Sequence, residues 1–266
     1  MLWLVVPEEL PEELPEELPE ELLEQWRARF AEPSQGWDFS FLEGQVEADE
    51  PPWSYEDLAR SALSGATSAL DMGTGGGEVL LRLVDALPED TLATEGWAPN
   101  LPHATEALAP HGIAIVPYDC EHDALMPFED GRFDVVLDRH ESYVAAEVFR
   151  VLRPGGVFVT QQVDGRDLEE THALFGGTPA YSHVTLANLR AEAEEAGFVI
   201  ERAQEWSGSL RFADVDAFVS YVRMVPWEVP EDFSVDRYAE QLLAMRDDDL
   251  VFTRRMFVLV CRRLDH

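Results

Sequence analysis

The chain contains no lysine: all 19 of its basic residues are arginine, against 53 acidic residues. This absence excludes Schiff-base and pyridoxal chemistry at a lysine, and it excludes the phosphate-binding lysine of P-loop nucleotide hydrolases. The formal net charge is -34, and the nine glutamates of residues 1–24 account for only part of it. A chain this acidic repels phosphate backbones, so nucleic acid is an unfavourable partner.

Cysteine and long apolar runs are also scarce. Cys120 and Cys261 lie far apart, each beside a strand-like apolar run, which favours a reducing compartment. The apolar start, residues 1–6, is too short for a signal peptide, and no run is long enough to span a bilayer. We therefore expect a cytoplasmic protein with no membrane partner.

Metal ligands are too few to predict a metal site. Cys120 and His122 lie close in sequence, but no second cysteine or histidine pair completes a tetrahedral zinc site. Three aspartates at 247–249 are interpreted as a solvated turn. No metal is expected.

The N-terminus is of low complexity. Residues 7–22 are four copies of Pro-Glu-Glu-Leu. A proline at every fourth position removes amides that a helix needs, and neighbouring glutamates repel one another, so residues 1–35 are predicted to form an extended or mobile acidic arm. A helix can begin further on, near LLEQWRARF. Two interpretations stay open, a docking arm and a tolerated repeat expansion.

Residues 36–64 are predicted to form a helical lid. The segment is rich in aromatic and acidic residues, and Ser54 followed by Asp57 is typical of a helix N-cap, with a helix continuing to Leu63. It directly precedes a glycine-rich turn, so it is placed to fold over whatever that turn binds.

The remainder, residues 65–266, alternates short apolar runs with helical patterns. Strands are expected at 68–73, 91–96, 112–119, 132–140 and 156–163, and helices at 78–87, 101–108 and 145–152, the last stopped by Arg-Pro-Gly-Gly. This order predicts an α/β fold with a parallel sheet covered on both faces.

The later part of the chain is less regular. Helices are expected at 185–197, 215–224 and 234–246, and strands at 199–206 and 257–264. In the second of these helices, Val215, Phe218, Val219 and Val222 lie at positions i, i+3, i+4 and i+7 of one helical face. Residues 207–249 are expected to form a helical cap inserted before the final strand.

The spacing of glycines in the turn LDMGTGGG, residues 70–77, distinguishes between possible nucleotide ligands. The dinucleotide pattern G-x-G-x-x-G started at Gly73 requires glycine at position 78, which is Glu78, and a P-loop requires lysine. Asp71, at the end of the strand, opposes a pyrophosphate and suits a ligand that carries an ammonium group and a ribose. The pattern favours a nucleoside that bears an amino acid.

At this turn the chain resembles the class I S-adenosylmethionine-dependent methyltransferases, and further motifs follow in order. Glu95 ends the second strand, 24 residues after Asp71, and Asp119 with Cys120 closes the third. LMPFEDGRFDVVLDRH and VLRPGGVFV resemble the family's fourth-strand region and its entry to strand five. The similarity covers residues 53–163 well. It implies a Rossmann-like, mostly parallel sheet of seven strands with the last antiparallel, and methyl transfer from S-adenosylmethionine.

The resemblance also implies a set of cofactor-binding residues. Glu95 is expected on the ribose hydroxyls and Asp119 with Cys120 near the adenine. Trp97 is expected either against the adenine or as an ordinary aromatic, and Tyr55, with Trp53, either near the ligand carboxylate or as a helix-packing group. The full set is Tyr55, Asp71, Gly73, Thr74, Gly75, Gly77, Glu95, Gly96, Trp97, Asp119, Cys120 and Arg139.

A general base is sought at the carboxyl edge of the sheet, where open α/β folds bind their ligands. The run at 138–142 emerges there from strand four, and His140 is the candidate catalytic base because an imidazole titrates near neutral pH. A hydrogen-bonded structural histidine is the alternative. Arg139 is expected to hold a carboxylate of the cofactor or substrate, or to pair with a neighbouring acid.

The acceptor is the least determined part. The C-terminal half is faintly similar to ribosomal RNA guanine-N1 methyltransferases, in LRF and VRMVPWEV, but the four-cysteine zinc ribbon of that family is missing and no basic patch replaces it. We therefore expect a small-molecule acceptor in an aromatic pocket; an RNA or protein methyltransferase and a non-catalytic S-adenosylmethionine-binding protein are the alternatives. The expected wall residues are Trp206, Phe212, Tyr221 and Trp227.

Overall fold

The computed structural model describes residues 19–33 and 39–264, which form two compact units. The sheet unit comprises Pro51–Asp164, His183–Trp206 and the chain from Met256 onwards. The accessory unit comprises the chain up to Glu50, with Gly165–Ser182 and Ser207–Arg255. This division differs from the expected one: the predicted lid, 36–64, is split after Glu50, and the predicted domain 65–266 contributes two segments to the accessory unit.

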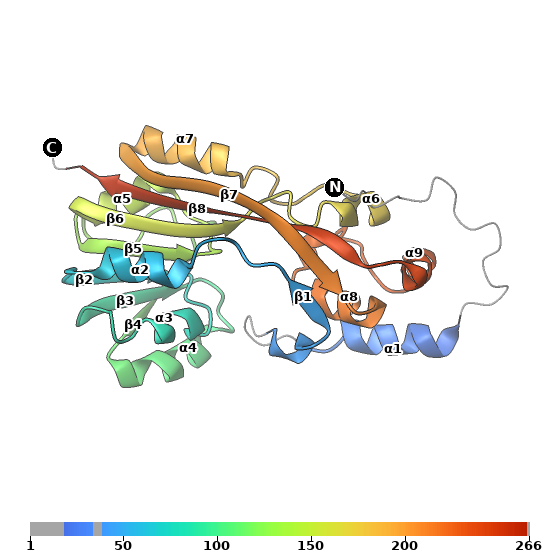
Figure 1. Cartoon of the computed structure of the whole chain (residues 1–266). Coiled ribbons are helices and arrows are strands. Elements are labelled where there is room, and N and C mark those ends of the chain that lie inside the picture. Colours follow the sequence, from blue (N-terminus) through green and yellow to red (C-terminus); the bar gives the residue numbers. More distant parts are fainter. Residues whose placement is uncertain (1–18, 34–38, 265–266) are drawn as a thin grey trace. The chain divides into compact units, whose positions relative to one another are not determined.

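The sheet unit contains the expected parallel sheet (Figure 1). Strands β2 to β6 are parallel, and β8 pairs antiparallel with β6. The strand order is β7-β8-β6-β5-β2-β3-β4. The bounds are β2 Ser68–Met72, β3 Asp90–Glu95, β4 Ala114–Pro117, β5 Phe133–Arg139, β6 Leu152–Val163, β7 Phe198–Phe212 and β8 Val251–Arg263. This arrangement confirms the predicted Rossmann-like class.

Helices cover both faces of this sheet, as expected. Val136 of β5 packs with residues of α5 (Ala145–Val151) and α7 (Leu186–Ala196). Its neighbours Val135 and Leu137 pack instead with α2 (Tyr55–Leu63). Successive residues of a strand point to opposite faces, so the two helix layers lie on opposite sides. Two shorter elements, α4 (Leu101–Leu108) and the 3-10 helix η2 (Ala109–His111), follow β3.

Local capping signals in the sequence are confirmed. The hydroxyl of Ser54 accepts a hydrogen bond of 3.1 Å from the amide of Asp57 at the start of α2. Several boundaries differ from prediction, two of them near the glycine loop and at the start of β6. Helix α3 covers only Glu78–Arg82, and the Arg-Pro-Gly-Gly stretch lies inside β6, where the pairing with β5 shifts register between Phe133 and Val135. The Pro-Gly-Gly residues therefore form an irregular, bulge-like part of the strand and do not end it.

The count of seven strands is wrong by one. The extra strand, β1 (Val46–Ala48), pairs antiparallel with Leu210–Phe212 of β7. Three residues give no alternation pattern that a sequence could reveal. Residues 207–212, which were expected to belong to a helical cap, instead continue β7, and residues 210–212 of this stretch pair with β1.

The accessory unit is built mainly from short helices around one apolar cluster. Helix α8 (Val215–Val222) buries its predicted stripe against Leu23 and Trp26 of α1 (Glu20–Phe30). The other helices are α6 Glu170–Phe175, α9 Ala239–Ala244 and the 3-10 helices η1 Ser40–Leu42, η3 Pro226–Glu228 and η4 Met245–Asp247.

The predicted acidic arm is only partly described. Its residues 1–18 and 34–35 lie outside the described residues. The last repeat copy enters α1, which begins directly after Pro19. A proline fits there because the first helical turn needs no amide donor from it. Among the described helices, none is long and apolar enough to cross a membrane.

One carboxyl group of the accessory unit is buried at an energetic cost. Glu228 is 9% exposed, and burial raises its pKa to about 8, reinforced by the negative charge of Asp167. The folded state therefore holds a proton that an unfolded glutamate, with a pKa of about 4.3, has already released. Between these two values the unfolding free energy falls as pH rises.

Replacing Glu228 with glutamine should reduce this pH dependence. The variant is expected to lose at least about 1 kcal/mol less stability than the wild type between pH 5.5 and pH 8.5. Urea denaturation at the two pH values measures the difference. The exposed Glu231→Gln is the matched control, and equal losses in the wild type and in Glu228→Gln would contradict the assignment.

Candidate functional site

The glycine loop between β2 and α3 has a backbone that only glycine adopts without strain. Gly73, Gly75 and Gly77 have φ angles of 57°, 62° and 89°. The loop lies against the carboxyl end of β3, where the amide of Thr74 donates to the carbonyl of Thr94 over 2.8 Å and that of Gly73 to the Thr94 hydroxyl over 3.3 Å. The expected loop is therefore present and tied to the neighbouring strand.

The amides of this loop are engaged by the protein itself. Besides those of Gly73 and Thr74, the Gly75 amide donates to the Glu95 carboxylate and the Gly77 amide to the Thr74 carbonyl. Four of the five amides from 73 to 77 thus already have acceptors. A phosphate would have to displace them, whereas phosphate-binding loops present free amides. The loop geometry supports the predicted preference against diphosphates.

Glu95 joins the loop to the end of β3. Its side-chain oxygens accept from the amides of Gly75 at 2.8 Å and Trp97 at 2.7 Å, and the residue is 4% exposed. Burial raises its pKa, although these amide bonds favour the charged form. A carboxylate offers about four acceptor positions. The Gly96 amide and the Asn100 side chain also act on Glu95, so ribose hydroxyls would share the carboxylate with these donors.

The closely packed end of β4 lies beside β3. A side-chain carbon placed on Gly96 would lie 2.9 Å from both the Tyr118 carbonyl and the Asp119 Cβ. Position 96 therefore requires glycine to keep Glu95 and Asp119 on neighbouring strand ends. The Asp119 side chain accepts from the amide of Glu121 and contacts His122 Nδ1 at 2.8 Å, which lowers its pKa.

Asp71 is buried beneath the loop. It is 7% exposed, and burial raises its pKa to about 7, with the nearby Glu95 adding to the shift. Tyr55, also buried, lies close enough to Asp71 and Asp138 for their charges to raise its pKa beyond the effect of burial. The structure thus brings Tyr55 to the acids of the site.

The turn after β5 is fixed by polar side chains of β6. Asp138, fully buried, accepts from the Thr160 hydroxyl at 2.8 Å and from the Gln162 amide group at 2.9 Å. Its other oxygen accepts from the Glu141 amide at 3.2 Å, and Gln162 also donates to the Glu141 carbonyl at 2.9 Å. Burial raises the pKa of Asp138 well above its usual range.

This turn places the Glu141 side chain directly on the glycine loop. A side-chain carbon on Gly73 would lie 2.5 Å from Glu141 Cγ and 2.6 Å from its Cβ. Burial raises the pKa of Glu141 to about 7, with the charges of Glu95 and Asp119 adding to the effect. Sequence reasoning missed Glu141 as a site residue, although it named the run at 138–142.

His140, the predicted base, lies at the same turn in a left-handed conformation, with a φ of 66°. Its Nε2 lies 3.3 Å from the Gln161 amide nitrogen, and Gln161 Oε1 accepts from the Trp53 indole N–H at 2.8 Å. The indole can only donate, so the amide must present its N–H groups to the imidazole. With that assignment His140 Nε2 accepts, and the neutral imidazole carries its proton on Nδ1.

Three other predicted residues lie at the rim. Trp97 is 49% exposed. This exposure fits an indole that stacks on a flat ligand ring, and it equally fits an ordinary surface aromatic. Cys120 is a free thiol whose pKa burial raises to about 12, with Glu141 the largest contributing charge, so it is not a nucleophile at neutral pH. Arg139 ends β5 and lies within electrostatic range of Tyr55.

The four expected wall residues of an acceptor pocket are divided between the units. Phe212 and Tyr221 pack in the apolar cluster of the accessory unit, at 5.2 Å between ring centroids, and Trp227 contacts Tyr181 edge-on. Trp206 packs with Trp53 in the sheet unit. Within the accessory unit these rings are therefore mainly packing groups.

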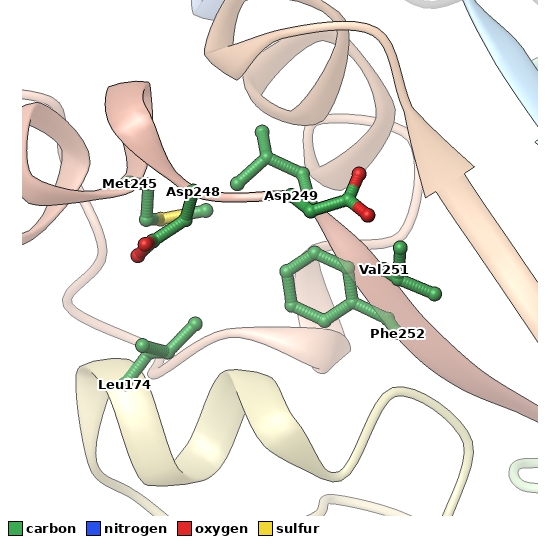
Figure 2. Close-up of a pocket in the computed structure, with 7 residues that line it drawn as sticks. Leu174, Met245, Asp248, Asp249, Val251 and Phe252 are labelled. Atoms are coloured by element: carbon green, nitrogen blue, oxygen red, sulfur yellow. The ribbon is translucent and has the colours of Figure 1, made fainter. Parts of the chain in front are cut away.

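A small cavity in the accessory unit is too small for an acceptor molecule. Its volume is about 20 Å³, close to that of one water molecule. Figure 2 shows Leu174, Met245 and Phe252 around it, with Asp248 and Asp249 beside them. Among the described residues, no group of three or more histidine, cysteine or acidic side chains could hold a metal ion.

Comparisons with known proteins agree with this geometry. Residues 70–160 match the family model of a methyltransferase domain. No curated protein matches the chain in sequence. A Bacillus halodurans protein described as a methyltransferase superposes with a TM-score of 0.58 at 19% identity, over 80% of this chain and 99% of that one.

Two further solved structures share the fold. The YcgJ protein of Bacillus subtilis has a TM-score of 0.56 at 15% identity, over 80% of this chain and 99% of that one. The [4+2]-cyclase SpnF has a TM-score of 0.50 at 17% identity, over 79% and 81%. At these identities the likeness establishes the fold, and function has to be argued from the site.

Gly73→Ala tests the contact between the loop and Glu141. Gly65 has a similar positive φ of 81° but open space around it, so alanine there measures backbone strain alone, about 1 to 2 kcal/mol. Gly73→Ala should cost more, because its methyl group meets Glu141. The excess should disappear when Glu141→Ala is added, in a double-mutant cycle followed by urea denaturation. An excess that persists would place Glu141 away from the loop.

Proposed function

Because residues 70–160 match the family model of a methyltransferase domain, we propose that this protein is an S-adenosylmethionine-dependent methyltransferase that acts on a small molecule. The observation that carries the proposal is the junction of Glu95 with the glycine loop. There a buried carboxylate accepts from the amides of Gly75 and Trp97 beside a loop whose own amides are mostly engaged. This arrangement suits a nucleoside with two ribose hydroxyls and a positively charged aminoacyl group.

The residues present fit that cofactor. S-adenosylmethionine, when bound, supplies an electrophilic methyl group. Gly73 leaves room for the Glu141 side chain, and Asp71 and Glu141 supply negative charge beside the loop. Asp119 and Cys120 follow β4 at the same sheet edge, where the adenine is expected. Trp97 and Arg139 are proposed to contact the rings and the carboxylate.

The chain's contribution to catalysis is mainly positioning. Displacement at a cationic methyl requires an aligned acceptor and the exclusion of water more than it requires a base. His140 remains the candidate base for an acceptor that must lose a proton. The Gln161 contact occupies its Nε2 lone pair, so proton transfer at that nitrogen requires this contact to open.

The proposal of a small-molecule acceptor is based on the net charge of the chain. With 53 acidic and 19 basic residues, the chain offers little attraction to RNA, whose binding depends mostly on phosphate contacts. The RNA methyltransferase and the non-catalytic binder are the competing functions, and each gives a different result below.

Calorimetry tests the cofactor. We expect micromolar binding of S-adenosylmethionine and S-adenosylhomocysteine and no binding of NAD. Glu95→Ala should weaken the first two by about 1 to 3 kcal/mol through the lost hydroxyl contacts. Glu106→Ala, an exposed acid on α4, is the control. Binding of NAD with indifference to both sulfur ligands would overturn the assignment.

A second experiment tests the acceptor class. Release of S-adenosylhomocysteine is measured over a panel of metabolites with amine, hydroxyl, thiol and activated carbon acceptors, and over ribosomal RNA. Turnover on a metabolite with no RNA retardation at low salt supports the proposal. Modification of RNA would favour the first alternative, and cofactor binding without turnover on the panel would favour the second.

A further inference from the structure

The Glu141 side chain is placed by contacts that come from β6, some 20 residues away in sequence. The Glu141 amide donates to Asp138 and its carbonyl accepts from Gln162, at 3.2 and 2.9 Å. The preceding amide, of His140, donates to the Gln161 carbonyl at 2.9 Å. The backbone on both sides of Glu141 is therefore fixed, and the side chain is directed onto Gly73 by the fold.

The surroundings of Glu141 are negative from each element that acts on it. Glu95 approaches from β3, Asp119 and Glu121 from the segment after β4, and Asp138 from β5; the Cys120 thiol also lies close. Arg139 and His140 precede it in the same turn. Concentrated negative charge in a half-buried place favours a cationic ligand, because the ligand relieves repulsion among the acids as well as forming its own contacts.

From this geometry we infer that Glu141 sets the preference of the site for the charged methyl donor over the neutral product. The inference rests on the proposed function. In methyl transfer the bond from methyl carbon to sulfur breaks, a bond to the acceptor forms, and the electron pair stays on sulfur. The sulfonium thereby becomes a neutral thioether, and the ligand loses one positive charge. A carboxylate at this position attracts the donor and loses that attraction once the reaction is complete.

The test compares dissociation constants for the two ligands in the wild type and in Glu141→Gln. At pH 8.5 the variant should bind S-adenosylmethionine about tenfold more weakly and S-adenosylhomocysteine less than twofold more weakly, the range expected of one partly buried charge interaction. Glu141→Asp keeps the charge and should recover part of the loss. Glu106→Gln removes an exposed charge on α4 that is not among these acids, and it should change either constant less than twofold.

A pH series separates a charge effect from a purely structural one. Lowering the pH from 8.5 to 6 protonates Glu141, whose pKa is about 7, so wild-type affinity for the donor should fall. The ligand and Asp71 titrate in both proteins, so the contribution of Glu141 is the difference between the two profiles. Glu141→Gln should show a smaller fall.

The outcomes distinguish this inference from the proposed function. If the wild type binds neither sulfur ligand, the proposed function fails. If the wild type binds both but Glu141→Gln weakens them equally, or leaves the pH profile unchanged, the proposed function stands and the role of Glu141 is wrong. Thermal unfolding of each variant shows that the changes in affinity occur in folded protein.

Discussion

The Glu95 carboxylate connects three parts of the site that are separate in sequence. It holds the glycine loop through Gly75 and the start of the next segment through Trp97, and it ends the strand that pairs with β2. Without it the loop would keep its two hydrogen bonds to Thr94 but lose the one from the Gly75 amide. Gly96 and Asp119 pack directly beside the strand end that this carboxylate occupies.

The four acidic side chains of the site are buried at an energetic cost, because burial disfavours their charged forms. Asp71, Glu95, Asp138 and Glu141 all have raised pKa values, and burial is the first cause in each case. A chain without lysine has few cations to neutralise them. Arginines that form ion pairs elsewhere, such as Arg150 with Glu147 and Arg132 with Asp90, neutralise acids outside this group. A cationic ligand would therefore reduce the repulsion among these acids on binding.

Sequence alone was sufficient for the elements whose signals are local. The Ser54 cap, the buried stripe of α8 and the glycine loop each depend on residues within one turn or one strand end, and the structure confirms them. The missed features depend on residues far apart. Which side chain of the run 138–142 reaches the loop is decided by Gln161 and Gln162 on β6 and by the left-handed backbone at His140. These contacts join residues about 20 positions apart, and no local sequence pattern indicates them.

The fold itself leaves the reaction open, since a [4+2]-cyclase has the same architecture as proteins described as methyltransferases. What separates possible reactions is the chemistry at the carboxyl edge of the strands. Here that edge carries amides already engaged by the protein and several buried acids, a combination that we propose opposes diphosphates and favours a cation. The neutral tautomer of His140, held through Gln161 and Trp53, places any proton-accepting step under the control of the same β6 side chains. Ligand preference and acid-base capacity are thus set by one turn and the strand beside it.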